Sequence, residues 1–172
     1  MSDIRLLDAR DAERDRARLA ETLADCVAGG APLGFRWPFP VEEAHRWWGG
    51  VIDSVAAGNT LLFGAYVDGR LCGTVQLGFD GPCNQRHRGD VRKLLVHRDA
   101  RGKSLGTRLM ASLQDEAGKR SLALLTLETA TGSEAERLYW KLGYTKAGEI
   151  PNYALMPDGR PCATSLLWKA LG

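Results

Sequence analysis

The segment of this chain best suited to bind a phosphate is VHRDARGKSLGTRLM, residues 96–110. Its Gly-Lys-Ser triplet at 102–104 matches the end of a nucleotide-binding P-loop, but the earlier glycine that such a loop requires is replaced by His97. The spacing of Gly102 and Gly106 also differs from that of the dinucleotide-binding pattern G-x-G-x-x-G. An apolar strand nevertheless leads through this turn into a helical pattern, and the unpaired N–H groups and dipole of a helix N-terminus attract anions. The turn therefore fits a phosphorylated ligand or, on pattern alone, a solvated connection.

Three further side chains stand where they could transfer protons. Asp90 opens an apolar strand, Glu128 ends another, and Tyr139 lies in a helical pattern. Carboxylates and phenols serve as general bases and acids in active sites. Each also has a structural interpretation, because Tyr139 falls on an apolar helical stripe typical of core packing and both carboxylates fit solvent-facing charges.

Hydrophobic periodicity and turn residues predict the elements that position these side chains. Asp68-Gly69 is a strong signal for a two-residue hairpin, and Ser133 with Glu136 forms a capping box before the helix that carries Tyr139. The nearly continuous apolar run SLALLTLE predicts a strand buried on both faces. In order, we expect helices over 10–28 and from 41 to Gly58, strands over 60–67, 70–78 and 91–97, a helix over 105–118, a strand over 121–128, a helix over 133–142, and strands over 144–148 and 162–171.

This order of elements predicts an α/β fold with a mixed sheet. Two N-terminal helices and an antiparallel meander come first, and a right-handed parallel β-α-β crossover follows from residue 91 onward. A length of 172 residues, without an internal repeat or linker, favours a single domain over 1–172.

Composition argues against several classes of protein. The net charge is only +2 and no basic run is interleaved with aromatic residues, so we expect no nucleic-acid partner. No stretch approaches the ~20 apolar residues of a membrane span, and the N-terminus MSDIRLLDARDAERDR has no signal-peptide core. The four cysteines are scattered without a C-x-x-C pair, which argues against a metal site and favours reduced thiols in the cytoplasm.

The surroundings of the glycine turn resemble a known family. VRKLLVHRDARGKSLGTRLM is similar to motif A of the GNAT N-acetyltransferases, in which an apolar strand ending in Val precedes R-G-x-G-x-G. SEAERLYWKLGYTKAGEIP resembles the late helix of that family, whose tyrosine precedes a Lys-Leu-Gly-Tyr/Phe turn. Within the superfamily, GGAPLGF, DVRKLLVH, LETATGSEAERLYWKLGY and PDGR are most similar to the tabtoxin-resistance acetyltransferase and its relatives. The resemblance covers most of the chain and implies a GNAT-like fold.

The resemblance implies acetyl-CoA as the acyl donor. Its pyrophosphate would lie on backbone amides of the glycine turn, and its pantetheine would pair with a strand edge left free where a parallel sheet splays beside a bulge. The positions implied for the pyrophosphate are Arg101, Gly102, Lys103, Ser104, Leu105 and Gly106, and those for the pantetheine are Leu94, Leu95 and Val96. Basic residues near the turn, Arg98, Arg101 and Lys103, either neutralise phosphate or remain solvated.

Two positions depart from the family pattern. Ser104 stands where the family usually has the first glycine of G-x-G, and Gly132 replaces an Asn that often starts the tyrosine helix. We expect Ser104 to be accommodated with helical backbone, whereas a requirement for positive φ would compromise the site. Any hydrogen bond that the Asn makes to pantetheine must come from elsewhere or be absent.

The resemblance also implies roles for the three proton-transfer candidates. Tyr139 would lie near the CoA sulfur and protonate the leaving thiolate. Asp90 and Glu128 match acidic positions in the tabtoxin-resistance relatives that are thought to deprotonate the acceptor, directly or through water. Asp90 ranks ahead of Glu128 because its DVRKLL context is the closer match.

We therefore expect a cytoplasmic, acetyl-CoA-dependent N-acetyltransferase that acts by direct transfer in a ternary complex. Its partner would be a small-molecule amine that is amino-acid-like or toxin-like, and the oligomeric state, a homodimer included, stays open. Two alternatives remain: a protein N-acetyltransferase, and an acyl-CoA-binding sensor with weakened catalysis. The acceptor site is expected in the loop 29–39, the helix from 41 and IPNYALMPDGR, with Phe35, Trp37, Phe39 and Tyr153 as apolar walls and Glu42 and Glu43 facing a cationic amine.

Overall fold

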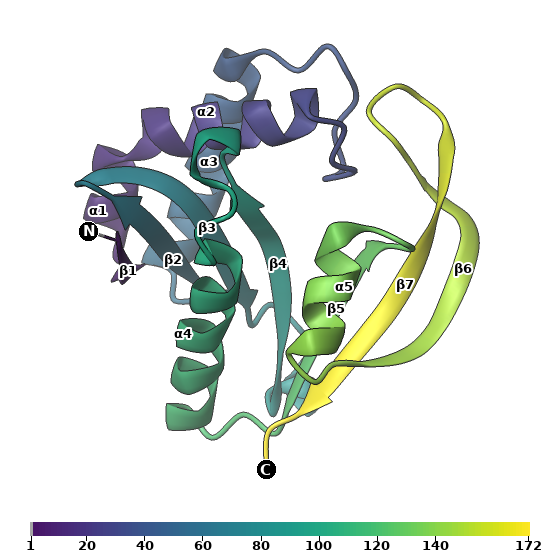
Figure 1. Ribbon diagram of the computed structural model, residues 1–172. Helices are drawn as coiled ribbons and strands as arrows, with labels where there is room; N and C mark the ends of the chain where they lie inside the picture. Colours follow the sequence, from purple (N-terminus) through teal and green to yellow (C-terminus); the bar gives the residue numbers. More distant parts are fainter. Residues whose placement is uncertain (1) are drawn as a thin grey trace.

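The computed structural model of the protein describes residues 2–172 and shows a mixed sheet flanked by helices (Figure 1). Its strands lie in the order β1-β2-β3-β4-β5-β7-β6. The helices are α1 (Ala9–Arg14), α2 (Arg16–Ala28), α3 (Val41–Ala56), α4 (Leu105–Lys119) and α5 (Glu134–Lys141). The strands are β1 (Ser2–Leu7), β2 (Thr60–Val67), β3 (Arg70–Gly78), β4 (Arg88–Val96), β5 (Leu124–Ala130), β6 (Thr145–Leu155) and β7 (Pro161–Ala170).

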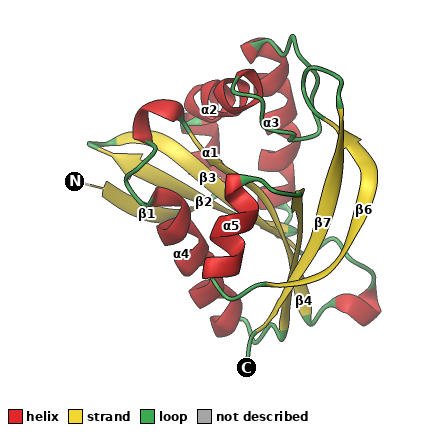
Figure 2. Ribbon diagram, turned by 45° about the vertical axis from the view of Figure 1, so that its right-hand side comes forward, coloured by secondary structure: helices red, strands yellow, loops and turns green. Residues whose placement is uncertain are grey.

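Helices cover both faces of the sheet and enclose two hydrophobic clusters. Helices α1, α2 and α3 pack against one face, while α4 and α5 lie on the other (Figure 2). Along β4, Val91 packs in the cluster with α4, whereas Leu95 packs in the cluster with α2 and α3. The predicted α/β fold, with an antiparallel meander followed by a parallel crossover, is confirmed.

The N-terminal region differs from its prediction. The helix expected over 10–28 is two helices, because the backbone leaves helical geometry at Asp15, whose carboxylate accepts a hydrogen bond from the Tyr66 hydroxyl on β2. The sequence also gave no signal for β1, which pairs antiparallel with β2. Only Leu7 of that strand is buried, so the apolar alternation that marks a strand is weak there.

The hairpin between β2 and β3 forms as predicted. Asp68 and Gly69 both have positive φ, 50° and 80°, which is the conformation of a type I′ turn. The turn sets the register between β2 and β3, and β3 in turn pairs with β4. Among the described residues, no helix is long and apolar enough to span a membrane.

Strands β4 and β5 pair over a short distance and then separate (Figure 1). Their parallel register is limited to Arg88–Leu124, Gly89–Leu125 and Asp90–Thr126. Beyond that point, β4 continues to pair with β3 on its other side, and β5 continues with β7. The sheet therefore has two arms that diverge after Asp90.

A β-bulge interrupts β4 just beyond this divergence. Gln76 of β3 pairs with Arg92, and Thr74 pairs with Leu95, so the β4 side holds one extra residue. Lys93 has φ 50°, a left-handed conformation that is uncommon in residues other than glycine. A bulge bends its strand and re-aims side chains, and here it places Arg92 and Lys93 on the same face of the sheet.

Two predictions for the C-terminal half need correction. The run SLALLTLE is not buried on both faces, because Leu125 and Leu127 are buried while Thr126 is half-buried and Glu128 is exposed. The strand predicted over 144–148 extends to Leu155, so most of IPNYALMPDGR lies within β6 and the hairpin that joins it to β7. Charged and small residues along the exposed β6 weaken its apolar alternation.

Candidate active site

The turn between β4 and α4 exposes a row of backbone donors. Helix α4 starts at Leu105, and its first backbone hydrogen bond from this end runs from the Arg108 N–H to the Ser104 carbonyl. Within the described residues, no acceptor bonds the N–H groups of residues 102–107. The helix dipole adds partial positive charge at the same place, so the turn has the features of an anion site.

Ser104 does not adopt the helical backbone that we expected. Its φ and ψ are 55° and 20°, which lie in the left-handed region, and Gly102 nearby has φ 76°. Among residues 2–172, the Ser104 side chain makes no capping hydrogen bond. The prediction of a helical Ser104 is therefore wrong, because the chain reverses sharply at this residue before α4 begins.

The other glycine of the turn has a packing role. A Cβ at Gly106 would approach Leu138 Cδ2 of α5 at 3.2 Å, which is closer than most such contacts. Gly106 thus allows α4 to lie close to the helix that carries Tyr139. Because its position serves helix packing, a bulky substitution there would disturb more than an anion site.

The basic residues near the turn differ in whether other groups of the protein already hold their side chains. Arg98 is held by Asp25 of α2, through both its backbone N–H and its guanidinium. Arg101 donates from Nε to the Val96 carbonyl at 3.3 Å. Lys103 is exposed, and no hydrogen bond or ion pair engages it within residues 2–172. Lys103 is therefore the cation best placed to meet a phosphate without first breaking a hydrogen bond, although the Asp68 carboxylate lies near enough to interact with its charge.

The strand edge predicted for pantetheine is free of β5. Leu94, Leu95 and Val96 lie beyond the last β4–β5 pair, so this edge of β4 has no parallel partner. Leu94 and Val96 pack with the α4 cluster, whereas Leu95 is buried in the α2–α3 cluster. The bulge at Lys93 and the divergence of the two strands together produce the splayed edge that the sequence predicted.

Tyr139 is buried beneath α5, and its ring packs edge-on against Tyr144 with centroids 5.6 Å apart. Burial raises the pKa of the Tyr139 phenol above its ordinary value, so the hydroxyl keeps its proton. Within residues 2–172, no hydrogen-bond partner engages that hydroxyl. Tyr144 has a similar setting, because burial also raises its pKa, and the Gln114 side chain is a polar neighbour of its hydroxyl.

Asp90 and Glu128 lie on the same face of the sheet. Asp90 pairs with Thr126 and its carboxylate accepts the Thr126 hydroxyl, so both side chains share one face. Glu128 follows two residues later on β5 and projects to that face too, about 7 Å further along the strand. The face is the one covered by α3, opposite to Tyr139.

The two carboxylates differ in their contacts. Asp90 bonds the guanidinium of Arg88 and the Thr126 hydroxyl, and lies 3.5 Å from Arg92 Nη2. Glu128 is exposed, and among residues 2–172 it has no hydrogen bond or ion pair. A carboxylate without bound donors is the better placed of the two to accept a proton. The geometry therefore favours Glu128 over Asp90, the reverse of the ranking from sequence.

A pocket of about 420 Å³ lies on this face between α3 and strands β2, β3 and β4. Trp47 and Val51 of α3 form one wall, and Gln76, Arg92 and Lys93 form the other. The sequence predicted that the tryptophan helix would border the acceptor site, but it gave no role to the three polar residues opposite. Their placement depends on the bulge in β4, which has no sequence signature of its own.

The aromatic residues proposed as acceptor walls divide into two groups. Phe35 and Phe39 pack together with centroids 4.3 Å apart, and Phe35 also meets Trp47. Trp37 and Tyr153 are more than half exposed. Phe35 and Phe39 therefore pack in the hydrophobic cluster with α2 and α3, whereas Trp37 and Tyr153 lie on the surface.

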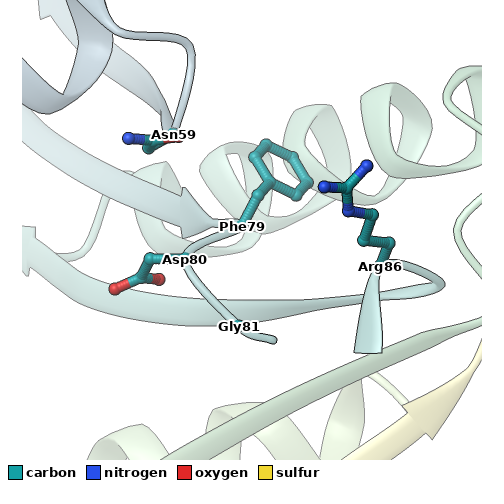
Figure 3. A pocket seen from close by; sticks show the side chains of 5 residues that line it. All are labelled: Asn59, Phe79, Asp80, Gly81 and Arg86. Carbon is teal, nitrogen blue, oxygen red and sulfur yellow. The ribbon is translucent and has the colours of Figure 1, made fainter. Parts of the chain in front are cut away.

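A larger open hollow, of about 570 Å³, lies at the opposite end of β4 from the glycine turn. Asn59, Phe79, Asp80, Gly81 and Arg86 line it, and Figure 3 shows the Asp80 carboxylate turned away from Arg86. Asp80 instead pairs with Arg92, at 2.6 Å. This hollow is separate from the row of free N–H groups.

The fold and site define a class of protein in which an anion-binding helix N-terminus lies beside the open edge of a splayed parallel strand pair. The model of the acetyltransferase (GNAT) family matches residues 18–144, so the chain belongs to that family. An IAA acetyltransferase of Azospirillum brasilense is 34% identical over 89 residues, 51% of this chain and 53% of that protein. The chain thus matches about half the length of this curated relative.

Solved structures share the fold over nearly the whole chain. A ribosomal-protein-alanine N-acetyltransferase from Brucella melitensis superposes with a TM-score of 0.81 at 22% identity, over 98% of this chain and 99% of its own. A phosphinothricin acetyltransferase from Sinorhizobium meliloti, in complex with acetyl-CoA, has a TM-score of 0.81 at 18% identity, over 99% and 89%. The superfamily prediction is confirmed, while the closer likeness to tabtoxin-resistance acetyltransferases stays a prediction.

Replacing Ser104 with glycine is expected to preserve or raise the free energy of unfolding. A left-handed residue other than glycine costs about 1 kcal/mol, and the Ser104 side chain makes no capping bond that would be lost. The matched control is Ser112→Gly inside α4, which should lower the free energy of unfolding by roughly 0.5 kcal/mol. Urea unfolding of both variants tests this, and an equal loss in both would show that the Ser104 hydroxyl stabilises the turn.

Proposed function

We propose that this protein is an acetyl-CoA-dependent N-acetyltransferase that acylates the amine of a small molecule. The observation that carries the proposal is the combination of free N–H groups at residues 102–107 with the β4 edge at 94–96, which has no strand partner and whose Val96 carbonyl is met by Arg101 Nε. The first suits a pyrophosphate, and the second suits an extended pantetheine with amide groups. Membership in the GNAT family and the acetyl-CoA complex of the Sinorhizobium meliloti structure support the choice of donor.

The residues of the turn fit the donor in charge and shape. Gly102, Lys103, Ser104, Leu105 and Gly106 present free backbone donors, whereas the Arg101 N–H predicted to join them is bonded to the Arg98 carbonyl at 3.3 Å. Lys103 adds a solvent-exposed positive charge, and the left-handed backbone at Gly102 and Ser104 is typical of turns whose N–H groups bind anions. Bound acetyl-CoA would supply a thioester carbonyl for attack, and the chain must then orient the amine and manage two protons.

The α3 face supplies the proton acceptor in our proposal. The amine must lose a proton to present its lone pair to the thioester carbonyl, and Glu128 accepts that proton directly or through water. Asp90 organises the point of divergence through Arg88 and Thr126, so we assign it a positioning role in addition to any contact with the amine.

Tyr139 supplies the proton donor on the opposite face. When the new C–N bond forms and the C–S bond breaks, the electron pair goes to sulfur, and the Tyr139 hydroxyl protonates the thiolate. Its raised pKa means that the phenol stays protonated over the working range of pH and so still carries the proton to be donated. The amino-acid-like acceptor and the tabtoxin-type relationship remain part of this proposal.

A panel of amines with thiol-release detection tests the proposed function. We expect CoA thiol release with at least one small primary amine. Binding of acetyl-CoA without release of thiol with any amine, peptide amines included, would instead support an acyl-CoA sensor. Turnover only with peptides would support a protein N-acetyltransferase.

Reversing the charge of Lys103 is expected to weaken acetyl-CoA binding. Lys103→Glu puts a negative charge beside the turn, which should raise Kd by roughly five- to tenfold at low salt and by less at high salt. Lys119→Glu is the matched control, because it makes the same charge change near the other end of α4, about 24 Å away. Isothermal titration calorimetry measures both, and equal effects would place the phosphates elsewhere.

Removing the Tyr139 hydroxyl is expected to slow catalysis while acetyl-CoA affinity is kept. Tyr139→Phe should lower kcat by roughly ten- to a thousandfold, near the range for one proton-transfer group. Tyr144→Phe is the control, since that tyrosine is also buried in the same cluster and has a raised pKa. If both variants lose the same small activity and the same stability, Tyr139 serves packing only.

Neutralising Glu128 is expected to slow turnover in a pH-dependent way. Glu128→Gln should reduce kcat/KM most at neutral pH and less at high pH, where free amine is abundant. Asp90→Asn provides the comparison and should also lower the melting temperature, because its carboxylate bonds Arg88 and Thr126. A pH-rate profile of Glu128→Gln that parallels the wild type would remove Glu128 as the base.

A further inference from the structure

The pocket beside α3 contains polar donors that the proposed chemistry does not use. The Gln76 side chain is only 5% exposed, and its Nε2 is buried without a hydrogen-bond partner in the described chain. Leaving a buried donor unpaired is costly, and such a group often marks a place where a ligand or water binds. Gln76 lines the pocket from β3.

Lys93 adds an uncompensated positive charge to the same wall. Its Nζ donates to the Leu33 carbonyl at 2.7 Å and lies 5.5 Å from the ring centres of Phe35 and Trp47. Within residues 2–172, no carboxylate forms an ion pair with it. Burial, together with the nearby Arg92 charge, lowers the pKa of this ammonium, as expected for a cation that lacks a counter-ion.

The neighbouring charges do not neutralise Lys93. Arg92 pairs with Asp80 at 2.6 Å and lies 3.5 Å from Asp90, so these acids are occupied by guanidinium groups. Asp90 also bonds Arg88. An ammonium has three donors, and within residues 2–172 the Leu33 carbonyl is the one hydrogen-bond acceptor that engages that of Lys93. Lys93 therefore has hydrogen-bonding capacity to spare.

The backbone that places Lys93 here is itself unusual. Its φ of 50° costs of order 1 kcal/mol or more in a residue other than glycine, and such outliers concentrate at functional sites. The bulge turns Lys93 onto the face that also carries Arg92, and Asp90 stands two residues before Arg92 on that face. The pocket therefore adjoins the point where β4 and β5 diverge.

We propose that the pocket between α3 and strands β2–β4 binds a carboxylate of the acceptor, with Lys93 and Gln76 as its donors. The substrate class is then an amine that carries a carboxylate, such as an amino acid, with its ammonium directed toward Asp90 and Glu128. This inference rests on the proposed acetyltransferase function and deepens it by naming what the acceptor must carry. Gln76 Nε2 offers a neutral N–H donor and Lys93 Nζ a charged one, and a carboxylate accepts from both kinds of donor.

The test compares each amino acid with its decarboxylated amine as acceptor, at saturating acetyl-CoA. The wild-type kcat/KM should favour the carboxylate member by roughly ten- to a hundredfold, mainly through KM. Lys93→Met and Gln76→Glu should both remove that preference, the first by deleting the cation and the second by placing a negative charge in the wall. Lys119→Met is the matched control on the exposed end of α4 and should keep the preference.

The readout separates a binding role from a structural one. If Lys93 only anchors the loop through Leu33, Lys93→Met lowers turnover of the amino acid and of its decarboxylated amine equally. That result would overturn the carboxylate subsite. Equal turnover of both members by the wild type overturns it too, while the acetyltransferase function stands. Retained acetyl-CoA binding by each variant, measured by thermal shift, shows that it is folded.

A binding measurement keeps the inference testable without turnover. If no amine of either class releases thiol, the proposed function fails. Calorimetric titration of the same pairs into the CoA-bound protein then decides the subsite by itself. Tighter binding of the carboxylate member that is lost in Lys93→Met supports the subsite, and equal binding of the two members refutes it.

Discussion

The separation of β4 from β5 after the Asp90–Thr126 pair is the constraint on which the rest of the site depends. A continuous parallel pair would use the β4 edge for β5 and close the space between the arms. Here the pairing stops after three residues on each strand, and each strand keeps its antiparallel partner on the outer side. Asp90 fixes the point of divergence through Thr126 and Arg88, so the edge beyond it is free without loss of the sheet.

The free edge of β4 is bordered by the β4–α4 turn on the α4 side and by a pocket on the α3 side. On the α4 side, the reversal through Gly102 and Ser104 leaves the first N–H groups of the helix unpaired, close to the free strand edge. On the α3 side, the bulge at Lys93 places two cationic side chains beside a pocket. A donor and an acceptor can thus approach the same gap from opposite faces, with Tyr139 on one and Glu128 on the other.

Local chemistry determined what could be predicted from the sequence. The hairpin at Asp68-Gly69, the Ser133 cap of α5 and the glycine turn before α4 depend on neighbouring residues and were recognised. The predicted capping box is only half formed, because the Glu136 carboxylate accepts from the Gly132 N–H instead of that of Ser133. The left-handed backbone of Ser104 and the bulge at Lys93 depend on strands paired from elsewhere in the chain. Hydrophobic periodicity along the sequence therefore does not predict them. The availability of Glu128 compared with Asp90 likewise depends on partners brought together by the sheet.

The central claim is that acetyl-CoA lies along the free edge of β4 with its pyrophosphate on the turn before α4. Amide hydrogen exchange with and without acetyl-CoA tests this most directly, because it reports each segment separately. The account predicts slower exchange at residues 94–96 and 102–107 on binding, with little change in β6. Protection confined to the hollow lined by Phe79 and Arg86, with residues 94–107 unchanged, would contradict it.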